Sequence, residues 1–253
     1  MNRFDYSIYY RRFHDDSEEH AETMTRNMAE LLGRHLPADR SSPIIDVGCG
    51  YGFALRAMRN LGYTNLLGLE VSPEQAQKAR DAGFQVIVTD DTIAWLEAHR
   101  SQFAFASLLD VLEHVPIQVQ IGFALAIHEV LQPGGKLFLT VPNASAILSA
   151  RWRYNDYTHH SSFTEHSLYF VLKNAGFDEI KIDASKGLGR LPKRVWRRQS
   201  RDALRRWIVR WCWLQVFKAE LSWEKLDEVS FELNLQAVGS RTAQANSRER
   251  EVK

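Results

Sequence analysis

The sequence predicts an α/β fold in which a seven-stranded, mostly parallel sheet is covered by helices on both faces, with a helical insertion before the last strand. Three observations lead to this prediction. A buried strand at 44–47 runs into a glycine-rich turn and then a helix, short apolar strands alternate with helices from there onward, and acidic residues follow several strands. Ligands of such open sheets bind beyond the carboxyl ends of the strands, so we expect the functional site at that edge.

Composition fits one such domain with an appendage. The chain has 253 residues, of which 45% are hydrophobic and 25% charged, and its net charge of +1 singles out no class of partner. Two cysteines are too few for a disulfide framework, which favours a reducing cytoplasm. Neither a secretory signal nor an apolar run of about 18 residues is visible in the sequence. We therefore expect a cytoplasmic location.

Three regions are expected along the chain. Residues 1–40 form an N-terminal arm, rich in Tyr, Phe and Arg, and a helix that opens at Ser17 with an N-cap and early acids and ends at Pro37. Residues 41–240 form the domain. Residues 241–253 lack apolar content and are expected to be a disordered tail.

Strands and helices are expected to alternate along the domain. The strands are expected at 44–47, 66–70, 85–89, 103–109, 136–141, 178–184 and 229–238, and the helices at 53–61, 73–82, 91–99, 117–131 and 165–175. The last two strands are expected to form an antiparallel hairpin. Asp46, Glu70, Asp90 and Asp110 fall at or just after the ends of the first four strands and are therefore expected to converge on one crevice.

The glycine turn indicates which cofactor the crevice holds. The run Asp46-Val47-Gly48-Cys49-Gly50-Tyr51-Gly52 lets a ligand approach the backbone closely, as in dinucleotide sites. The spacing of dinucleotide sites differs, because here the third glycine comes one residue early and Phe53 stands in its place. Asp46 would also repel a pyrophosphate, whereas it suits a ligand that carries an ammonium and a sulfonium. S-adenosylmethionine is such a ligand.

Five segments in order resemble the motifs of class I S-adenosylmethionine-dependent methyltransferases. They are the glycine turn, 66–70, 86–90, 103–114 and 131–136. The resemblance implies a Rossmann-like fold, methyl transfer, and S-adenosylhomocysteine as the product. It places the methionine end of the cofactor at Asp46, Gly48 and Gly50, the ribose at Glu70 and the adenine at Asp90.

The resemblance implies further cofactor contacts on both sides of these motifs. They involve Val71, Asp91, Leu109 and Asp110, together with Tyr10 and Arg11 of the N-terminal arm. In related enzymes such an arm lies over the cofactor. The other interpretation is that the arm packs on the outside of the domain.

The loop after the fifth strand carries the candidate acceptor residues. Residues 152–160 hold Asp156, His159 and His160 beside the expected position of the methyl group. A histidine, with an unperturbed pKa of about 6.5, suits removal of a proton from an acceptor hydroxyl, and Asp156 could fix its tautomer. We expect His159 to be the base, with His160 as the second candidate. A structural or substrate-binding role is the alternative for both.

This loop, with Phe163-Thr164 and Ala175-Gly176-Phe177, also resembles methyltransferases of bacterial cell-surface polysaccharide biosynthesis, such as that of O-antigen and lipopolysaccharide. The resemblance implies O-methylation of a sugar hydroxyl on a polysaccharide or lipid-linked glycan. Four alternatives remain open. They are a ubiquinone-type lipid O-methyltransferase, an RNA methyltransferase, a catalytically inactive cofactor-binding module, and a nicotinamide-dependent oxidoreductase.

A metal site is the alternative interpretation of the run from Asp110 to His114. It is similar to a region of ubiquinone-pathway O-methyltransferases in which a Glu-x-x-Glu-His pattern holds a divalent metal, but Asp110 replaces the first Glu and shortens its reach. We favour the interpretation without a metal, in which Leu109 and Asp110 line the cofactor site while Glu113 and His114 cap the next helix. A metal, if present, would bind and acidify the acceptor hydroxyl.

The insertion at 186–227 is basic and rich in tryptophan. Between Lys186 and Lys218 eleven bases are opposed by one acid, Asp202, and a helix there would place Leu204, Trp207, Ile208, Trp211 and Leu214 on one face. Such a helix is typical of an in-plane anchor for anionic lipid, so we expect peripheral contact with the inner membrane through 190–218. Packing on its own domain or in a homodimer is the second interpretation. Nucleic acid is the least favoured partner.

Overall fold

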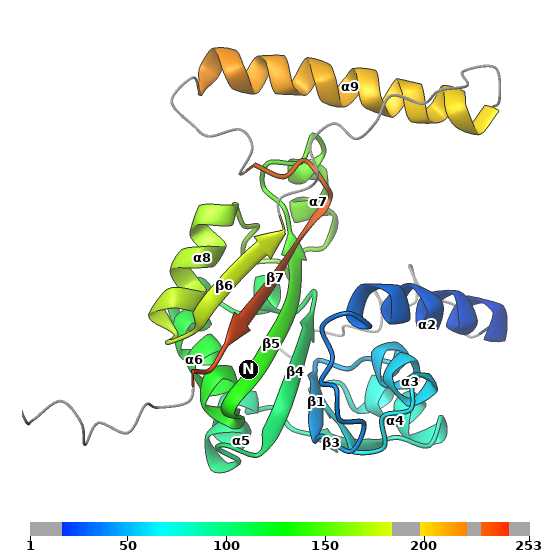
Figure 1. Ribbon diagram of the computed structural model, residues 1–253, viewed down its shortest axis with the longest axis vertical. Coiled ribbons are helices and arrows are strands. Elements are labelled where there is room, and N and C mark those ends of the chain that lie inside the picture. The colour runs from blue at the N-terminus through cyan, green and yellow to red at the C-terminus, as the bar shows by residue number, and fades with distance from the viewer. Residues whose placement is uncertain (1–16, 184–197, 222–228, 243–253) are drawn as a thin grey trace, which may run out of the picture.

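The computed structural model describes residues 17–183, 198–221 and 229–242, which are built around one seven-stranded sheet (Figure 1). The strand order is β3-β2-β1-β4-β5-β7-β6, and β7 is antiparallel to both of its neighbours, whereas β1 to β5 pair in parallel. The strands are β1 (Ile44–Val47), β2 (Leu66–Glu70), β3 (Gln85–Val88), β4 (Phe103–Leu109), β5 (Leu131–Pro142), β6 (Asp178–Asp183) and β7 (Asn234–Ser240). The predicted fold class is confirmed.

Helices cover both faces of this sheet. On one face lie α2 (Glu18–Leu32), α3 (Phe53–Asn60) and α4 (Pro73–Asp81), and on the other lie α5 (Thr92–Ala98), α6 (Gln120–Val130) and α8 (Glu165–Asn174). Side chains of Ser17, Ser72, Asp91 and Thr164 cap the first turns of α2, α4, α5 and α8. Each cap satisfies a backbone N–H that the helix itself leaves unpaired.

Neighbouring side chains of each strand point to opposite faces, and the sheet therefore has a hydrophobic core on each side. Ile44 and Phe105 pack with α2, α3 and α4, whereas Ile45 and Ala106 pack with α5, α6 and α8. All four side chains are fully buried. These two cores hold the carboxyl ends of β1 and β4 in place, and the site lies at those ends.

Three short elements and one long helix lie near the carboxyl ends of the parallel strands. The 3-10 helices η1 (Leu112–His114) and η2 (Ile117–Val119) follow β4, and α7 (Ser149–Asn155) follows β5. The long helix α9 (Arg198–Glu220) lies beyond the same end of the sheet, near α7 (Figure 1). No helix within the described ranges combines the length and the apolar composition needed to cross a bilayer.

The structure corrects several predicted boundaries. β5 begins at Leu131 rather than at residue 136, because Gln132 to Gly135 form a bulge in the pairing with β4. β7 begins at Asn234 rather than at residue 229, and α7 was not predicted at all. Arg241, assigned by its polarity to the disordered tail, belongs to the fold, because its guanidinium donates to Ser101 Oγ and to two backbone carbonyls at the end of α6.

Three groups of predictions concern residues outside the described ranges. They are the cofactor contacts of Tyr10 and Arg11, the parts of the basic insertion at 186–197 and 222–227, and the tail at 243–253. Within the described part of the insertion, α9 is one helix, as predicted.

Candidate active site

A cavity of about 540 Å³ opens at the carboxyl ends of β1, β2 and β4. Its size lies in the range of small-molecule sites, which is roughly 300–1,000 Å³. The glycine turn and Glu70 line one side, and another side is lined by Trp152 of α7 and by Asp156 and His159 of the loop after it. One cavity therefore brings together the predicted cofactor residues and the predicted acceptor residues, which are about a hundred positions apart in the chain.

Gly48 leaves β1 with φ of +75°, a conformation that favours glycine. Its N–H donates to the carbonyl of Leu69 at 2.7 Å. A Cβ at this position would lie 2.5 Å from Cγ2 of Val111, so a side chain has no room. Gly50 follows with φ of +53°. The backbone of the turn therefore lines the cavity and is open to close approach by a ligand.

Asp46 lies behind this turn and is 2% exposed. Its Oδ1 accepts a hydrogen bond from Ser107 Oγ at 2.6 Å. Burial raises the pKa of Asp46 to about 7; the bond from Ser107 opposes this rise and the nearby Glu70 adds to it. A cationic ligand in the cavity would favour the ionised carboxylate.

Glu70 ends β2 and is held by three backbone N–H groups. Oε1 accepts from Val71 at 2.9 Å and from Ser72 at 2.8 Å, and Oε2 accepts from Gly50 at 2.8 Å. Burial raises the pKa of Glu70, and these backbone bonds oppose the rise. The carboxylate thus ties β2 to the glycine turn, and its remaining lone pairs are available to a diol.

The other predicted cofactor residues divide into two groups. Val71, Leu109 and Asp110 line the cavity, and Asp110 Oδ1 accepts from Thr140 Oγ1 at 2.8 Å and from Asn234 Nδ2 at 2.9 Å. Asp90 and Asp91 are exposed and do not line it. Asp91 instead caps α5 by accepting from the N–H of Ala94. The adenine contact predicted for Asp90 stays a prediction.

The two candidate bases lie in different environments. His159 lines the cavity and its Nε2 is 4.0 Å from Asp156 Oδ2, whereas His160 is exposed and does not line the cavity. Burial lowers the pKa of His159, and Asp156 opposes that change. Asp156 is itself fixed by Thr158, whose N–H and hydroxyl both donate to Oδ1. Geometry therefore favours His159 over His160.

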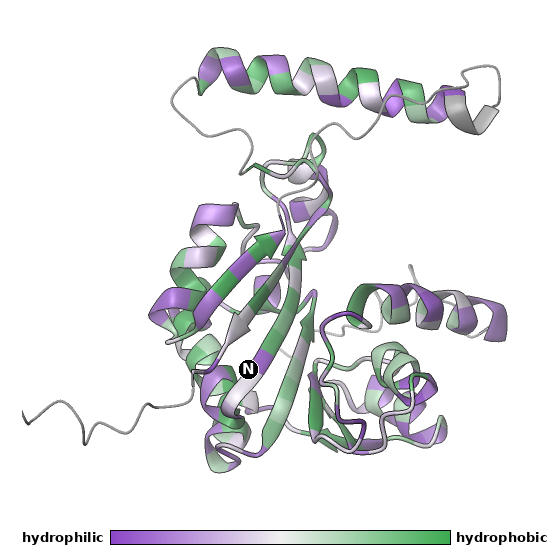
Figure 2. Ribbon diagram, viewed as in Figure 1, coloured by the Kyte–Doolittle hydropathy of each residue, from purple (hydrophilic) through white to green (hydrophobic). Residues whose placement is uncertain are grey.

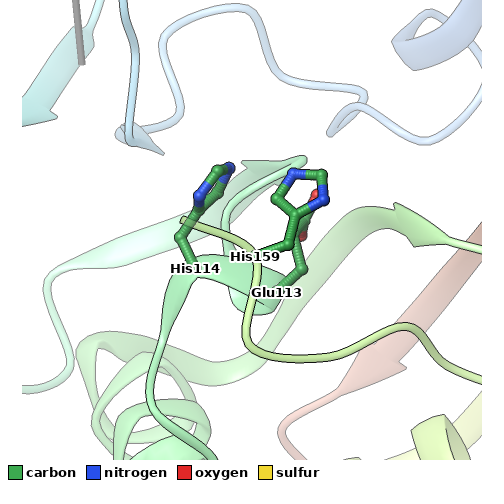
Figure 3. A group of neighbouring side chains, drawn as sticks. All are labelled: Glu113, His114 and His159. Carbon is green, nitrogen blue, oxygen red and sulfur yellow. The ribbon is translucent and has the colours of Figure 1, made fainter. Parts of the chain in front are cut away.

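Glu113 and His114 approach His159 from η1 (Figure 3). The imidazole rings of His114 and His159 meet edge to face with centroids 4.6 Å apart, and the N–H of His160 donates to the carbonyl of Glu113 at 2.7 Å. Burial lowers the pKa of His114 to about 4, and the neighbouring His159 adds to this. Burial and then Asp110 raise the pKa of Glu113 well above its usual range.

Sequence reasoning missed three features of this site. The prediction that Glu113 and His114 cap the next helix is wrong, because neither η2 nor α6 has a side-chain cap and Glu113 lies fully buried beside the acceptor loop. Met24 and Met28 of α2 line the cavity. Trp152 and Asn155 of α7 line it too. Sequence spacing gave no signal for these contacts, because they form between segments far apart in the chain.

The residues present fit S-adenosylmethionine. The turn lines the cavity with glycine backbone, and at Gly48 a Cβ would collide with Val111. Asp46 offers a buried carboxylate to a cationic ligand, and Glu70 offers acceptor atoms to a ribose. A pyrophosphate would instead meet two acidic groups at this turn. The cavity therefore suits the methyl donor better than a dinucleotide.

Comparison with known proteins agrees with this chemistry. Residues 18–182 match the family described as "Methyltransferase domain". A ubiquinone biosynthesis O-methyltransferase of Xanthomonas axonopodis pv. citri (strain 306) is 34% identical over 105 residues, which cover 40% of this chain and 43% of that protein. A 27-O-demethylrifamycin SV methyltransferase of Amycolatopsis mediterranei (strain S699) is 27% identical over 143 residues, 53% of this chain and 52% of the relative. The matches thus span about half of these relatives or less.

Solved structures share the fold. A SAM-dependent methyltransferase from Archaeoglobus fulgidus superimposes with a TM-score of 0.64 at 16% identity, covering 94% of this chain and 100% of the other. A Haemonchus contortus phosphoethanolamine N-methyltransferase, in complex with S-adenosylhomocysteine, gives 0.58 at 16% identity, covering 87% of this chain and 53% of that one. The cofactor of this chain is S-adenosylmethionine, and the chain belongs to the methyltransferase-domain family of class I S-adenosylmethionine-dependent methyltransferases.

Proposed function

We propose that this protein is an O-methyltransferase and that its acceptor hydroxyl binds in the cavity beside His159. One observation supports this most strongly: His159 and Asp156 line the same cavity as the glycine turn and Asp46. S-adenosylmethionine supplies a methyl group on a positively charged sulfur, which becomes a neutral thioether when the methyl leaves. The protein then has to align the acceptor oxygen with that methyl group and remove its proton.

In this proposal His159 acts on the acceptor hydroxyl and Asp156 is a positioning residue. The side chain of Asp156 is held by two bonds from Thr158, and its second oxygen lies 4.0 Å from His159 Nε2. Such a carboxylate orients the imidazole and favours its protonated form. Trp152 and Phe123 line the same cavity and exclude water from one side of the acceptor.

We further propose that the acceptor is amphiphilic, with a sugar hydroxyl of a bacterial surface polysaccharide or lipid-linked glycan as the first candidate. Large apolar and aromatic side chains are exposed near the acceptor loop: Leu148 is 53% exposed, Trp152 39%, Tyr154 77% and Tyr157 80%. Tyr and Trp combine an apolar ring with a polar tip and suit a surface where a polar group meets lipid. Exposed Ile208, Val209, Trp211 and Val216 of α9 lie at the same end of the molecule (Figure 1).

A ubiquinone-type lipid acceptor is the second candidate. The observation that favours it is the similarity to proteins named ubiquinone biosynthesis O-methyltransferase over 40% of this chain. Both candidates carry a hydroxyl and a long apolar part. They differ in the hydroxyl itself, which belongs to a sugar in the first case and to an aromatic ring in the second.

Transfer of labelled methyl groups tests the proposal. The full chain is incubated with methyl-labelled S-adenosylmethionine and three separate bacterial extracts: lipid-linked glycans, isoprenoid phenols and RNA. Label in the first fraction supports the glycan acceptor, and label in the second supports the quinone-type alternative. Label in RNA alone, or in no fraction although the cofactor binds, would overturn O-methylation of an amphiphilic acceptor.

Replacement of the two histidines tests the assignment of His159. We expect His159→Ala to bind S-adenosylhomocysteine as the unaltered protein does but to lose roughly 10²–10⁴-fold in turnover, the range typical of acid–base residues. His166→Ala, an exposed histidine on α8, is the matched control. If His160→Ala loses turnover and His159→Ala does not, the assignment of His159 is wrong.

A further inference from the structure

We infer that Glu113, His114 and His159 form a binding site for one divalent transition-metal ion, such as Zn²⁺, on the acceptor side of the cavity (Figure 3). One ligand atom from each of the three residues lies within 4.8 Å of the other two. Glu113 and His114 come from η1 and His159 from the loop after α7, and in Figure 3 their side chains project toward the same side. All three line the cavity.

Glu113 provides the strongest argument for a cation. The residue is fully buried, and neither Oε1 nor Oε2 has a hydrogen-bond partner. Buried carboxylates are normally paired or hydrogen-bonded, because an isolated charge in the interior is costly. The nearby acids Asp110 and Asp156 make a negative charge on Glu113 still less favourable. A bound metal ion would take a Glu113 oxygen as a ligand and would balance this local excess of acidic groups.

His114 is held in the tautomer that a metal requires. Its Nδ1 lies 2.8 Å from Thr158 Oγ1, and the single hydroxyl proton of Thr158 is donated to Asp156 Oδ1 at 2.6 Å. Thr158 must therefore accept from Nδ1–H, which leaves the lone pair of the neutral ring on Nε2. Metal-binding histidines are commonly oriented in this way, by a hydrogen bond from the other ring nitrogen.

His159 offers the third ligand atom. Its Nδ1 is buried and has no hydrogen-bond partner, while Asp156 lies on the side of Nε2. The bond from His160 N–H to the carbonyl of Glu113 joins the two segments directly beside the site. The pair of rings and the carboxylate are therefore held together by the backbone as well as by side-chain packing.

This set of ligands differs from the one considered in the sequence. Asp110 is not among the three, because its Oδ1 accepts from Thr140 and Asn234, and His159 takes the third place from a distant loop. Two imidazoles and one carboxylate suit Zn²⁺, Mn²⁺, Fe²⁺ or Co²⁺ better than Mg²⁺ or Ca²⁺, which prefer oxygen ligands. Three protein ligands also leave a coordination position open, as in catalytic sites.

A metal here would supply Lewis acidity to an acceptor oxygen in the same cavity. This role rests on the proposed function, whereas binding of the metal does not. A ring nitrogen that holds a metal ion cannot also accept a proton. In a metal-loaded protein His159 would hold the ion, which would acidify the acceptor hydroxyl, and His159 would not itself accept the proton.

Metal titration of the full chain tests the inference without an activity assay. The protein is stripped with EDTA, dialysed, and titrated with ZnCl₂ by calorimetry and with CoCl₂ by visible absorption, which reports the ligand geometry. We expect one equivalent to bind, and Zn²⁺ to raise the unfolding temperature. We expect Glu113→Gln and His159→Ala each to weaken binding by more than about 100-fold, beyond the roughly 10–100-fold typical of outer-shell substitutions.

Two further variants complete the test. His160→Ala removes the exposed histidine next to His159 and should leave Zn²⁺ affinity unchanged. Thr158→Val keeps the shape of the side chain but removes the acceptor for His114 Nδ1–H, so it should weaken Zn²⁺ binding by about 10–100-fold. If neither Zn²⁺ nor Co²⁺ binds the unaltered protein, or if Glu113→Gln and His160→Ala bind Zn²⁺ equally well, the inference is wrong.

Failure of the metal site and failure of the proposed function are distinguishable. If the protein binds no Zn²⁺ and its methyl transfer is unchanged by EDTA, the proposed O-methylation is supported and the inferred metal site is wrong. If one equivalent of Zn²⁺ binds at these residues but no extract is methylated, the metal site is supported and the proposed acceptors are wrong.

Discussion

Asp46 is the acidic residue that we expect to interact with the positive charge of the cofactor. Its carboxyl is buried, its pKa is raised to about 7, and it lines the cavity. Below that pH the residue is neutral, and a cationic ligand that favours the carboxylate must first displace a proton. In the cofactor-free protein the same shift makes stability fall as the pH rises from about 4 toward 7, because the folded state keeps a proton that the unfolded chain has lost.

Cofactor affinity should therefore depend on pH in a predictable direction. Between pH 6 and pH 7.5 we expect S-adenosylmethionine to bind more tightly as the pH rises, by up to about tenfold per unit below the pKa. Asp46→Asn keeps the shape of the side chain but removes its charge, so it should bind more weakly and with little pH dependence. Calorimetry across this range measures both. Equal pH dependence in the two proteins would contradict the role given to Asp46.

Gly48 supports a second prediction, because both its positive φ and its closeness to Val111 disfavour a side chain at this position. Gly48→Ala should destabilise the fold through the positive φ, by roughly 1–2 kcal/mol, and further through the contact of the new Cβ with Val111. Gly62→Ala is the matched control, since Gly62 has φ of +92° but open space around the expected Cβ. Thermal unfolding should show a larger loss for Gly48→Ala than for Gly62→Ala.

The contact itself can be relieved. In Gly48→Ala/Val111→Ala the neighbouring side chain is shortened, so the double variant should lose less stability than the sum of the two single variants. Additive losses would show that Val111 is not the obstacle.

The residues of the site were predictable where a local motif identifies them. Asp46, Gly48 and Glu70 lie at a strand end or a tight turn, and the sequence shows both. Glu113 was not predictable, because its environment is made by a loop about 45 positions later in the chain. The sequence analysis favoured His159 over His160, but it could not predict their different exposure, because only the path of the loop turns His159 into the cavity and leaves His160 exposed.

At the scale of elements, α9 is attached along one side and exposed along the other. Arg210 forms two bonds to Glu232, Trp213 Nε1 donates to the carbonyl of Ser145, and Phe217 packs on Phe231. This attachment corrects the predicted apolar face, because Leu204, Trp207 and Leu214 are half-buried whereas Ile208 and Trp211 are exposed. Packing on its own domain thus accounts for one side of the helix. Hydrophobic and hydrophilic residues alternate along it (Figure 2).

We expect the exposed side of α9 to bind anionic membranes. Arg201, Arg205, Arg206 and Lys218 are exposed together with the apolar side chains of this helix. Each base near an anionic surface contributes about 1 kcal/mol, so Arg201→Glu/Arg206→Glu should weaken binding to phosphatidylglycerol vesicles by more than about tenfold. Flotation at low salt measures the change, and high salt should release the unaltered protein.

A matched charge change tests whether the helix itself matters. Arg26→Glu/Lys136→Glu alters net charge equally at exposed positions on α2 and β5. It should weaken vesicle binding much less than the α9 variant. If the unaltered protein does not float with anionic vesicles at low salt, the membrane proposal is wrong.

The elements of the fold were predictable to different degrees for physical reasons. Strands β1, β2 and β4 are continuous apolar runs, and their bounds were predicted correctly. β5 extends further than predicted because paired glycines, which usually mark a turn, here form a bulge within the strand. The role of Arg241 is decided by carbonyls at the end of α6, which no property of the tail sequence reveals.

At the scale of the whole molecule, cofactor binding should raise the unfolding temperature. A ligand at about 100 times its dissociation constant stabilises the folded state by about 2.7 kcal/mol. In a protein of this size that corresponds to a rise of roughly 5–10 °C in the unfolding temperature. We expect S-adenosylhomocysteine to produce such a rise and NAD at the same concentration to produce none. A comparable rise with NAD would contradict the choice of cofactor.

The position of β7 between β5 and β6 has a consequence for biosynthesis. The ladder from β1 to β5 can form in the order in which the ribosome delivers it, but β6 pairs with no strand except β7 among the described residues. Residues 178–183 therefore have no strand partner until residues 234–240, more than fifty positions later in the chain, have been synthesised. During that interval the nascent chain exposes two sheet edges that chaperones could protect.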